Sequence, residues 1–282
     1  MTASRRKGPW RSLAASVVMA LALAGAVRAE GPQEKLPDTF FSLRLGGYSV
    51  RNADTVVRLD ANRAPVGTYI DFHDTLGGTN SATVVRLDGL YRFNEHHGLG
   101  FGWYDLRFTG SRTLEKDIEW GGQSYAVGVN VDSQLSFETY KLNYQYSLFH
   151  NEEVELGVSA GLHVMRVSTG ISATGFNQSQ AQSQSQAVTA PLPVWGLFGV
   201  YRFTPRFSAF YSYQIFNINY QDTYSGGLQD FLIGTEYRLF RNFGLGVAYN
   251  RFALHLKAKG DATTLYLDTS WNGGMLYGTV YF

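Results

Sequence analysis

From about residue 39 onward, apolar and polar residues alternate one by one along the chain. Between Glu138 and Leu148, every even-numbered position from Tyr140 onward is Tyr or Leu, and the positions between them are Lys, Asn, Gln and Ser. Successive side chains of a β-strand point to opposite faces, so this segment predicts a strand with one apolar and one polar face. The same pattern recurs at 85–93, 154–164, 231–239 and 243–250. Helical periodicity is almost absent, which predicts an all-β protein.

Three features favour a membrane-spanning barrel over a soluble sandwich or a lipocalin-like barrel, which would show the same alternation. The alternating runs are about 10–17 residues long, whereas soluble strands usually have about 5–6 and tilted membrane strands about 9–11. Short polar connections at 94–97, 150–153, 204–206 and 241–242 alternate with longer ones near 51–81, 111–131, 172–188, 221–226 and 258–272. Aromatic residues recur near strand ends, as in an interfacial girdle, at Tyr91, Phe93, Tyr144, Tyr146, Tyr201, Phe203 and Tyr237.

The four short turns divide the chain into five up-and-down pairs and predict an antiparallel barrel of about ten strands. The expected strands are 39–50, 82–93, 98–110, 133–148, 153–171, 189–203, 206–220, 227–240, 242–257 and 272–282. An even number places both termini in the periplasm. Strand-like pieces within the long connections, at 55–60 with 68–72, 118–127 and 264–268, are interpreted as hairpins above the membrane. If such a pair entered the membrane the count would be twelve, and the expected range is eight to twelve. A switch in apolar parity between Trp103 and Tyr104 indicates a β-bulge.

The first 29 residues have the pattern of a secretory signal peptide. A basic start precedes an apolar stretch, and Val27 and Ala29 occupy the −3 and −1 positions of a small-residue cleavage site. Residues 30–38 are polar and form a linker, so the barrel covers 39–282. Removing the signal peptide removes five basic residues and no acid, which changes the formal net charge from +1 to about −4. Without a basic surplus, a nucleic-acid partner is not expected.

The C-terminal strand ends the chain on alternating apolar residues, Leu276, Val280 and Phe282. This ending resembles the insertion signal of Gram-negative outer-membrane β-barrels, although Gly278 stands where a larger apolar residue is common. The segments 87–93, 154–163 and 236–249 look like those of a group of small proteobacterial barrels. The resemblance implies an outer-membrane location and contact with the barrel-assembly machinery during insertion. The outward loops would then lie near outer-membrane lipids and lipopolysaccharide, and we expect a monomer.

Opposite the apolar faces, the predicted strands carry charged residues that would point into the lumen. They are Arg44, Arg86, Asp88, Arg92, Lys141, Glu155, His163, Arg202, Glu236 and Arg238. The interior of a small barrel is just wide enough for side chains, and a buried charge must be paired. The favoured interpretation is an ion-pair core that closes the lumen of a structural or surface-exposed barrel. The alternative is a narrow passive channel, whose six basic and three acidic residues would favour anions. Glycines on the same face either leave room for water or let neighbouring side chains fit.

A lipid-modifying enzyme or a protease is the less favoured alternative, and we expect no enzymatic activity, cofactor or metal. Ser159 and His163 share the inner face, but four strand residues separate them by roughly 13 Å. Asp71, His73 and Asp74 form a polar cluster without a firm metal-binding spacing. The absence of cysteine excludes disulfides and thiol chemistry. The low-complexity segment 177–186 is expected to be a mobile surface loop.

Overall fold

The computed structural model describes residues 40–61, 66–174, 182–220, 224–259 and 263–282. The chain divides into two units, 1–35 and 36–282, and the description concerns the second. The predicted signal peptide with its cleavage residues Val27 and Ala29, and the predicted linker 30–38, lie outside the described residues.

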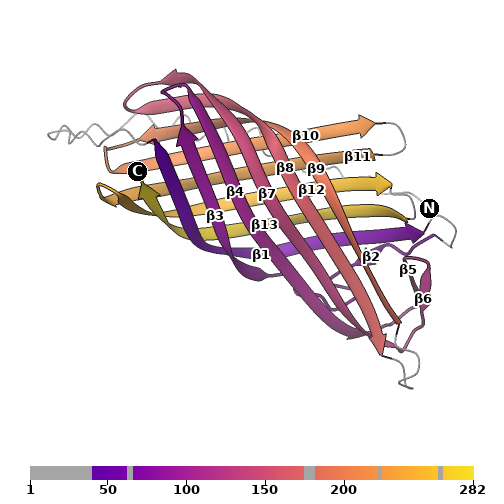
Figure 1. The fold of residues 1–282 in the computed structure, drawn as a ribbon. Helices are drawn as coiled ribbons and strands as arrows, with labels where there is room; N and C mark the ends of the chain where they lie inside the picture. The colour runs from indigo at the N-terminus through magenta and orange to yellow at the C-terminus, as the bar shows by residue number, and fades with distance from the viewer. Residues whose placement is uncertain (1–39, 62–65, 175–181, 221–223, 260–262) are drawn as a thin grey trace, which may run out of the picture. The chain divides into compact units, whose positions relative to one another are not determined.

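The described residues form thirteen antiparallel strands (Figure 1). The bounds are β1 (Phe41–Ala61), β2 (Ile70–Asp71), β3 (Ala82–Arg92), β4 (His97–Thr113), β5 (Ile118–Trp120), β6 (Gln123–Tyr125), β7 (Asn130–His150), β8 (Val154–Thr174), β9 (Gln182–Arg202), β10 (Phe207–Tyr220), β11 (Tyr224–Phe240), β12 (Phe243–Lys259) and β13 (Thr263–Tyr281). In this part of the chain no helix is long and apolar enough to cross a membrane.

Ten of these strands close into a ring. The main sheet has the order β13-β12-β11-β10-β9-β8-β7-β4-β3-β1, and β1 pairs in turn with β13. The two-residue strand β2 attaches only to β1, and β5 with β6 forms a separate hairpin. The prediction of an up-and-down barrel of about ten strands is therefore confirmed, and among the described residues no extra pair of strands enters the ring.

The strands are longer than predicted, and this corrects three of the expected long connections. The segment 54–61 belongs to β1 and pairs with 263–270 of β13. Its pairing with the segment 68–72 is limited to Val56 with Asp71 and Val57 with Ile70. Residues 182–186 of the expected mobile loop are strand residues opposite 169–173 of β8, while 177–181 lie outside the described residues. The expected hairpin within 118–127 is present as β5 and β6.

The reason for these differences is that each long strand has two halves of opposite polarity. On β7, the outward side chains from Tyr140 to Leu148 are apolar and exposed, and the inward ones are polar. Toward the other end of the strand, the inward side chains of Phe137 and Leu135 are fully buried and the outward ones are polar. The alternation thus continues, but the apolar residues move from the outer to the inner face.

The polarity reverses at one level around the ring. Trp103, Tyr140 and Val164 are register partners on β4, β7 and β8, and each is the last apolar residue on the outside of its strand. The corresponding residues elsewhere are Val85, Ile215, Phe231 and Tyr249. We call the part of the barrel between this level and the short turns the turn-side half, and the part on the other side of this level the loop-side half. The exposed apolar outer surface of the turn-side half is called the apolar band.

The predicted β-bulge between Trp103 and Tyr104 is wrong. β4 pairs with β7 from His97 to Thr113 without a shift in register. Trp103 is the last outward apolar residue of β4, and Tyr104 is the first inward apolar residue of the loop-side half. In the sequence, this change of face shifts the apolar parity by one residue, as a β-bulge would. Register shifts occur instead at Arg51/Asp54, Ser147/Phe149 and Arg238/Phe240.

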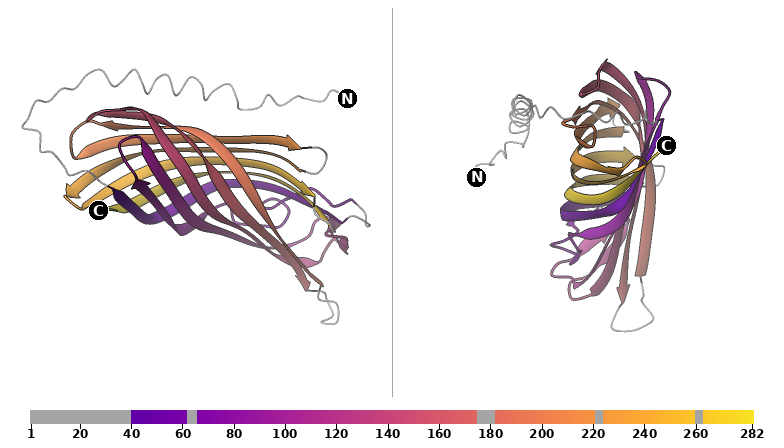
Figure 2. Two further views of the ribbon diagram at one scale, coloured as in Figure 1. Left: turned by 45° about the horizontal axis from the view of Figure 1, so that its top comes forward. Right: turned by 90° about the vertical axis from the view of Figure 1, so that its left-hand side faces the viewer.

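The ring is open between β9 and β10 in its loop-side half. The ladder between these strands ends at the pair Trp195 and Ile215, and Figures 1 and 2 show the two strands diverging beyond it. On β9, Pro193 and Pro191 lie just beyond Trp195 in the direction of the loop-side half. Proline has no N–H to donate to a ladder. The two prolines therefore explain why the pairing stops at this level.

Inward glycines make room for aromatic rings rather than for open space. Three of them face an aromatic residue of the adjacent strand, and a Cβ atom would overlap its ring. The pairs are Gly157 with Phe198, Gly234 with Phe210 and Gly246 with Tyr277. Of the two roles considered for these glycines, the three pairs fit the packing of neighbouring side chains.

Candidate functional site

The lumen of the turn-side half contains three layers of polar contacts, and the layer closest to the turns is built around Glu155. This carboxylate on β8 is fully buried. Arg92 of β3 donates to both of its oxygens at 2.7 Å, and Ser147 of β7 donates at 2.6 Å. Arg202 of β9 and His150 lie 3.5 and 3.6 Å from it. One carboxylate therefore connects β3, β7, β8 and β9.

The second layer is built around Glu236 on β11. Arg44 of β1 donates from Nε at 3.0 Å, and Thr279 of β13 donates at 2.7 Å. The hydroxyl of Tyr281 also donates to this carboxylate. Arg238 lies over the ring of Tyr281, 3.7 Å from its centroid. This layer ties β1 and β13, where the ring closes, to β11.

The third layer is a chain of contacts that crosses the lumen. Lys141 on β7 donates to Asp230 on β11, and both side chains are buried. Asn250 on β12 donates to Asp230 at 2.7 Å and accepts from the hydroxyl of Tyr48 at 2.5 Å. The indole of Trp271 on β13 donates to the same hydroxyl at 3.1 Å. Because β7 lies on the opposite side of the ring from β12, β13 and β1, these contacts bridge the two walls.

Two further pairs lie near this third layer. Arg86 donates to Asp88 at 2.8 and 3.1 Å, within one strand. The Nε2 atom of His163 lies 3.0 Å from the amide oxygen of Gln214. Two buried polar atoms next to this pair, Ser159 Oγ and His163 Nδ1, have no hydrogen-bond partner among the described residues.

An aromatic layer follows in the loop-side half. Trp271 stacks on Phe252 with ring centroids 4.2 Å apart and lies 5.4 Å from Phe137. Phe137 in turn lies 6.2 Å from Phe108. All four side chains are buried. Phe108 and Phe137 come from β4 and β7, whereas Phe252 and Trp271 come from β12 and β13, so these rings meet across the lumen.

The structure places all ten predicted lumen residues on the inner face and gives each a polar or aromatic contact. Asp230 is a further lumen residue that is not among the ten; it lies within the predicted strand 227–240 but precedes the apolar alternation of 231–239. Asp230 has the same parity as Glu236 and Arg238, and this signal was available. The layers also contain uncharged residues, which a pattern of charges alone does not predict: Tyr48, Ser147, Gln214, Asn250, Trp271, Thr279 and Tyr281.

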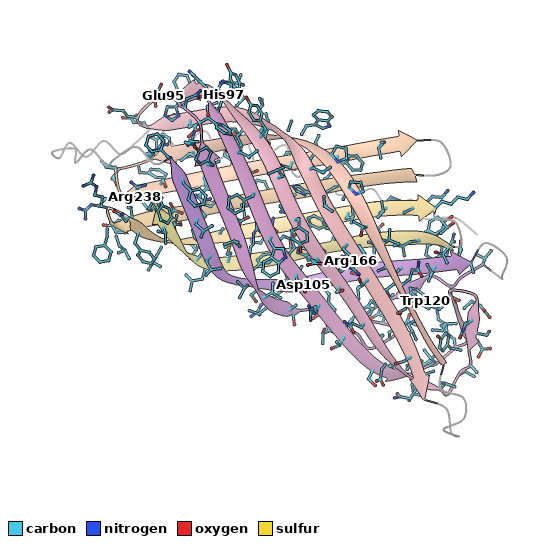
Figure 3. The ribbon with its side chains drawn as sticks, viewed as in Figure 1. Glu95, His97, Asp105, Trp120, Arg166 and Arg238 are labelled. Atoms are coloured by element: carbon cyan, nitrogen blue, oxygen red, sulfur yellow. The ribbon has the colours of Figure 1, made fainter. Side chains whose placement is uncertain are left out.

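The predicted insertion signal lies on the outer face of β13 and at the residue that follows this strand. Leu276 and Phe282 are 68% and 65% exposed, and Val280 also points outward. The intervening Tyr277 and Thr279 are buried in the lumen. The predicted girdle residues are also on the outside at the turn end, with Tyr91, Phe93, Tyr144 and Tyr237 all exposed. Glu95 and His97 mark this end in Figure 3, and Trp120 marks the other.

The polar residues considered for chemistry are placed as follows. His163 is engaged with Gln214 through Nε2, and no hydrogen bond joins it to Ser159 in the described part of the chain. Asp71 accepts the backbone N–H groups of His73 and Asp74, at 2.9 and 2.7 Å, which is the pattern of a local turn. Among the described residues, no group of three or more His, Asp or Glu side chains is arranged to hold a metal ion.

Comparison with known proteins shows similarity at the level of the fold. No protein-family model matches the chain, and no curated protein matches it by sequence. The outer membrane protease OmpT from Escherichia coli superposes with a TM-score of 0.50 at 12% identity, over 88% of this chain and 99% of that chain. The translocator domain of autotransporter NalP from Neisseria meningitidis gives 0.44 at 8% identity, over 83% and 86%. OprG from Pseudomonas aeruginosa gives 0.34 at 15% identity, over 86% and 95%.

At this identity the likeness to OmpT shows the fold alone. The closed antiparallel ring, the apolar band and this likeness agree with one another. The chain has the fold of a Gram-negative outer-membrane β-barrel, as the sequence predicted.

Proposed function

We propose that the chain is an integral outer-membrane protein whose lumen is closed and whose loop-side half stands above the membrane at the cell surface. The observation that carries this proposal is the aromatic layer, in which Phe137 on one wall contacts Trp271 on the other, and Trp271 stacks on Phe252. Below it, the contacts from Lys141 through Asp230 to Asn250 cross the same lumen. Water and ions would have to displace both layers to pass.

The polarity of the outer surface supports the proposed placement. The apolar band exposes large side chains such as Leu142, Leu197 and Val247, which are 51%, 54% and 54% exposed and which lipid would cover. The loop-side half has polar residues outside and an apolar core inside, which is the arrangement of a protein domain in water. We infer that the turns and the C-terminus face the periplasm and the loop-side half faces the medium.

A narrow channel for small, preferentially anionic solutes is the second candidate. The free atoms Ser159 Oγ and His163 Nδ1 favour it, because buried polar atoms without a protein partner commonly bind water. A hydrated pocket at this level would still end at the aromatic layer. The proposal includes no catalytic step, and a lipid-modifying enzyme or protease is the less favoured alternative. Lipid A and phospholipid profiles that differ between knockout and overexpressing cells would support that alternative.

Conductance in planar bilayers tests the closed lumen. The folded protein is identified by its heat-modifiable electrophoretic mobility. We expect it to give no stepwise current openings at a protein concentration where a general porin gives many. The physical reason is that the aromatic layer and the contacts from Lys141 through Asp230 to Asn250 are buried and both cross the lumen. Reproducible unitary steps from the folded protein would establish the channel and overturn the closed barrel.

Cysteine labelling tests the orientation, because the chain contains no cysteine. Glu115, whose side chain is 78% exposed in the loop-side half, and Glu95, in a turn at the opposite end, are suitable sites. On intact cells, a membrane-impermeant maleimide is expected to label Glu115→Cys and to reach Glu95→Cys only after the outer membrane is permeabilised. The reverse order of labelling would invert the proposed topology.

A further inference from the structure

The inner wall of the turn-side half is partly open to solvent, whereas the wall at the third layer and beyond is buried. On β7, the inward side chain of Asn143 is half-buried, but Lys141 and Thr139, the next two inward residues, are buried. On β10, Ser212 is half-buried and the following inward residue, Gln214, is buried. Solvent therefore reaches the inside of the barrel as far as the third layer and stops there.

The ion pair between Arg86 and Asp88 marks the same boundary on β3. The side chain of Asp88, which lies nearer the turns, is 22% exposed, whereas that of Arg86 is 3% exposed. At the turn end, the inward side chains of Arg92 and Arg202 are 21% and 33% exposed. The solvent-accessible space therefore extends from the third layer to the turn end of the barrel.

The two layers nearest the turns leave this space open because each stays in its own part of the ring. The partners of Glu155 come from β3, β7, β8 and β9, and those of Glu236 come from β1 and β13. In contrast, the contacts from Lys141 to Asp230 and Asn250 join the two walls. The space thus has a closed end at the third layer.

The wall of this space offers room and hydrogen-bonding atoms for water. Asn143 Oδ1 and Ser159 Oγ have no hydrogen-bond partner among the described residues. Gly100 on β4 is the register partner of Asn143, and a methyl group at Gly100 would meet no atom nearer than 3.5 Å. Polar atoms of this kind commonly bind internal water, so both features fit a hydrated interior.

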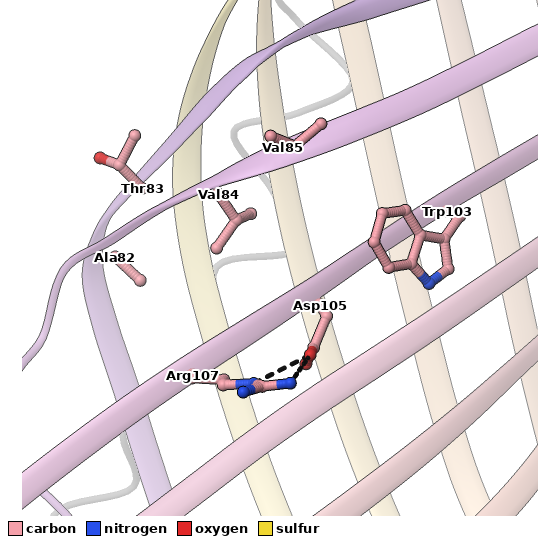
Figure 4. A pocket seen from close by; sticks show the side chains of 7 residues that line it. All are labelled: Ala82, Thr83, Val84, Val85, Trp103, Asp105 and Arg107. Atoms are coloured by element: carbon pink, nitrogen blue, oxygen red, sulfur yellow. Dashed lines mark hydrogen bonds and ion pairs between the residues drawn. The ribbon is translucent and has the colours of Figure 1, made fainter.

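The two gaps in the barrel wall lie beyond the closed end. The ladder between β3 and β4 continues up to the pair Arg86 and Tyr104, and that between β9 and β10 up to Trp195 and Ile215. Past the first of these pairs, the strands leave a groove of about 490 Å³ on the outer surface (Figure 4). The turn-side half is thus laterally sealed at these two seams, and its interior communicates with solvent through the turn end.

We propose that the turn-side half encloses a blind, water-filled vestibule. Water and small hydrophilic solutes enter it at the turn end and reach Asn143 and Ser212, but they do not pass Lys141 and Asp230. The vestibule rests on the proposed function, because the contacts that close the lumen form its inner end. In the proposed orientation it faces the periplasm, so the barrier between periplasm and medium begins at the third layer rather than at the turns.

Reaction of single cysteines with iodoacetamide in detergent micelles tests the vestibule, since the chain has no cysteine of its own. Asn143→Cys and its matched control Thr139→Cys are both inward residues of β7, on opposite sides of Lys141. Each rate is divided by that of the same variant unfolded in urea, and heat-modifiable mobility verifies folding. We expect Asn143→Cys to react at least tenfold faster than Thr139→Cys. Ser212→Cys, a near-isosteric change on β10, is expected to react like Asn143→Cys.

Two outcomes would overturn the vestibule. If Asn143→Cys and Ser212→Cys react as slowly as Thr139→Cys, the turn-side lumen is filled, and the closed barrel stands without a vestibule. If Thr139→Cys reacts as fast as the other two, water passes the third layer and the space is not blind. Conductance is measured separately on the native chain, so failure of the vestibule is distinguishable from failure of the proposed function.

Discussion

Replacing Asp230 by alanine is expected to lower the free energy of unfolding by about 3–5 kcal/mol, because it leaves the ammonium group of Lys141 buried without its counter-ion. The side chains of Lys141 and Asp230 are only 7% and 4% exposed. Asn250 would lose an acceptor at the same time, and its contact with Tyr48 would lose support. The measurement is a urea titration in detergent micelles, followed by tryptophan fluorescence.

Two controls separate this effect from a general loss of charge. The double variant Lys141→Met/Asp230→Leu removes both charges, and we expect it to recover most of the lost stability, since apolar replacements of a buried ion pair are often neutral. Asp268→Ala removes an exposed carboxylate, 3.3 Å from His255, and should cost less than about 1 kcal/mol. Similar losses for Asp230→Ala and Asp268→Ala would contradict a buried, bridging ion pair.

The turn-side half was predictable because its strands obey a single rule. Lipid requires apolar residues on the outside, so Tyr140 to Leu148 and Phe243 to Tyr249 each display one continuous apolar face. The polar residues between them then had to face the lumen, which is where Lys141, Glu155 and Glu236 lie. The alternation of side chains along a strand, together with lipid on the outside of the barrel, is sufficient to assign these residues to the outer face or to the lumen.

The loop-side half was not predictable by the same rule, because water replaces lipid on its outer surface. Beyond Tyr249, the outward residues of β12 become Arg251, His255 and Lys257, and the apolar ones point inward. The apolar residues change face at this level, so a pattern that requires one continuous apolar outer face predicts the end of the strand here although the strand continues. A search for a reversal of polarity along an unbroken period of two would have found the strand residues beyond this level.

The pairing of the lumen charges needed three-dimensional information. Arg44 and Glu236 are 192 residues apart, and Lys141 and Asp230 are 89 residues apart. Parity assigns each residue to the inner face, but the height at which two residues meet depends on the stagger of strands between them. The sequence therefore predicted which residues line the lumen, but not which residues bond to each other.

Replacing Trp271 by alanine is expected to lower the free energy of unfolding by about 3–5 kcal/mol. We expect the loss of structure to be confined to the loop-side half. The indole is buried, stacks on Phe252 and contacts Phe137, so its removal leaves a cavity where the two walls meet. It also removes the N–H that donates to Tyr48. The ladder between β9 and β10 already ends at Trp195 and Ile215, so in this half the two walls depend on side-chain contacts across the lumen.

Limited proteolysis in micelles distinguishes this local loosening from global unfolding. In the Trp271→Ala variant, we expect faster cleavage within the loop-side half and a protected turn-side half, because the Glu155 and Glu236 layers do not contain Trp271. The matched control is Trp195→Ala, which truncates a tryptophan that is 63% exposed on the outer surface and should leave the cleavage pattern unchanged. Uniform cleavage of both halves would show that the aromatic layer and the polar layers unfold as one unit. The aromatic layer would then be a general stabiliser of the barrel rather than the element that holds the loop-side walls together and closes the lumen.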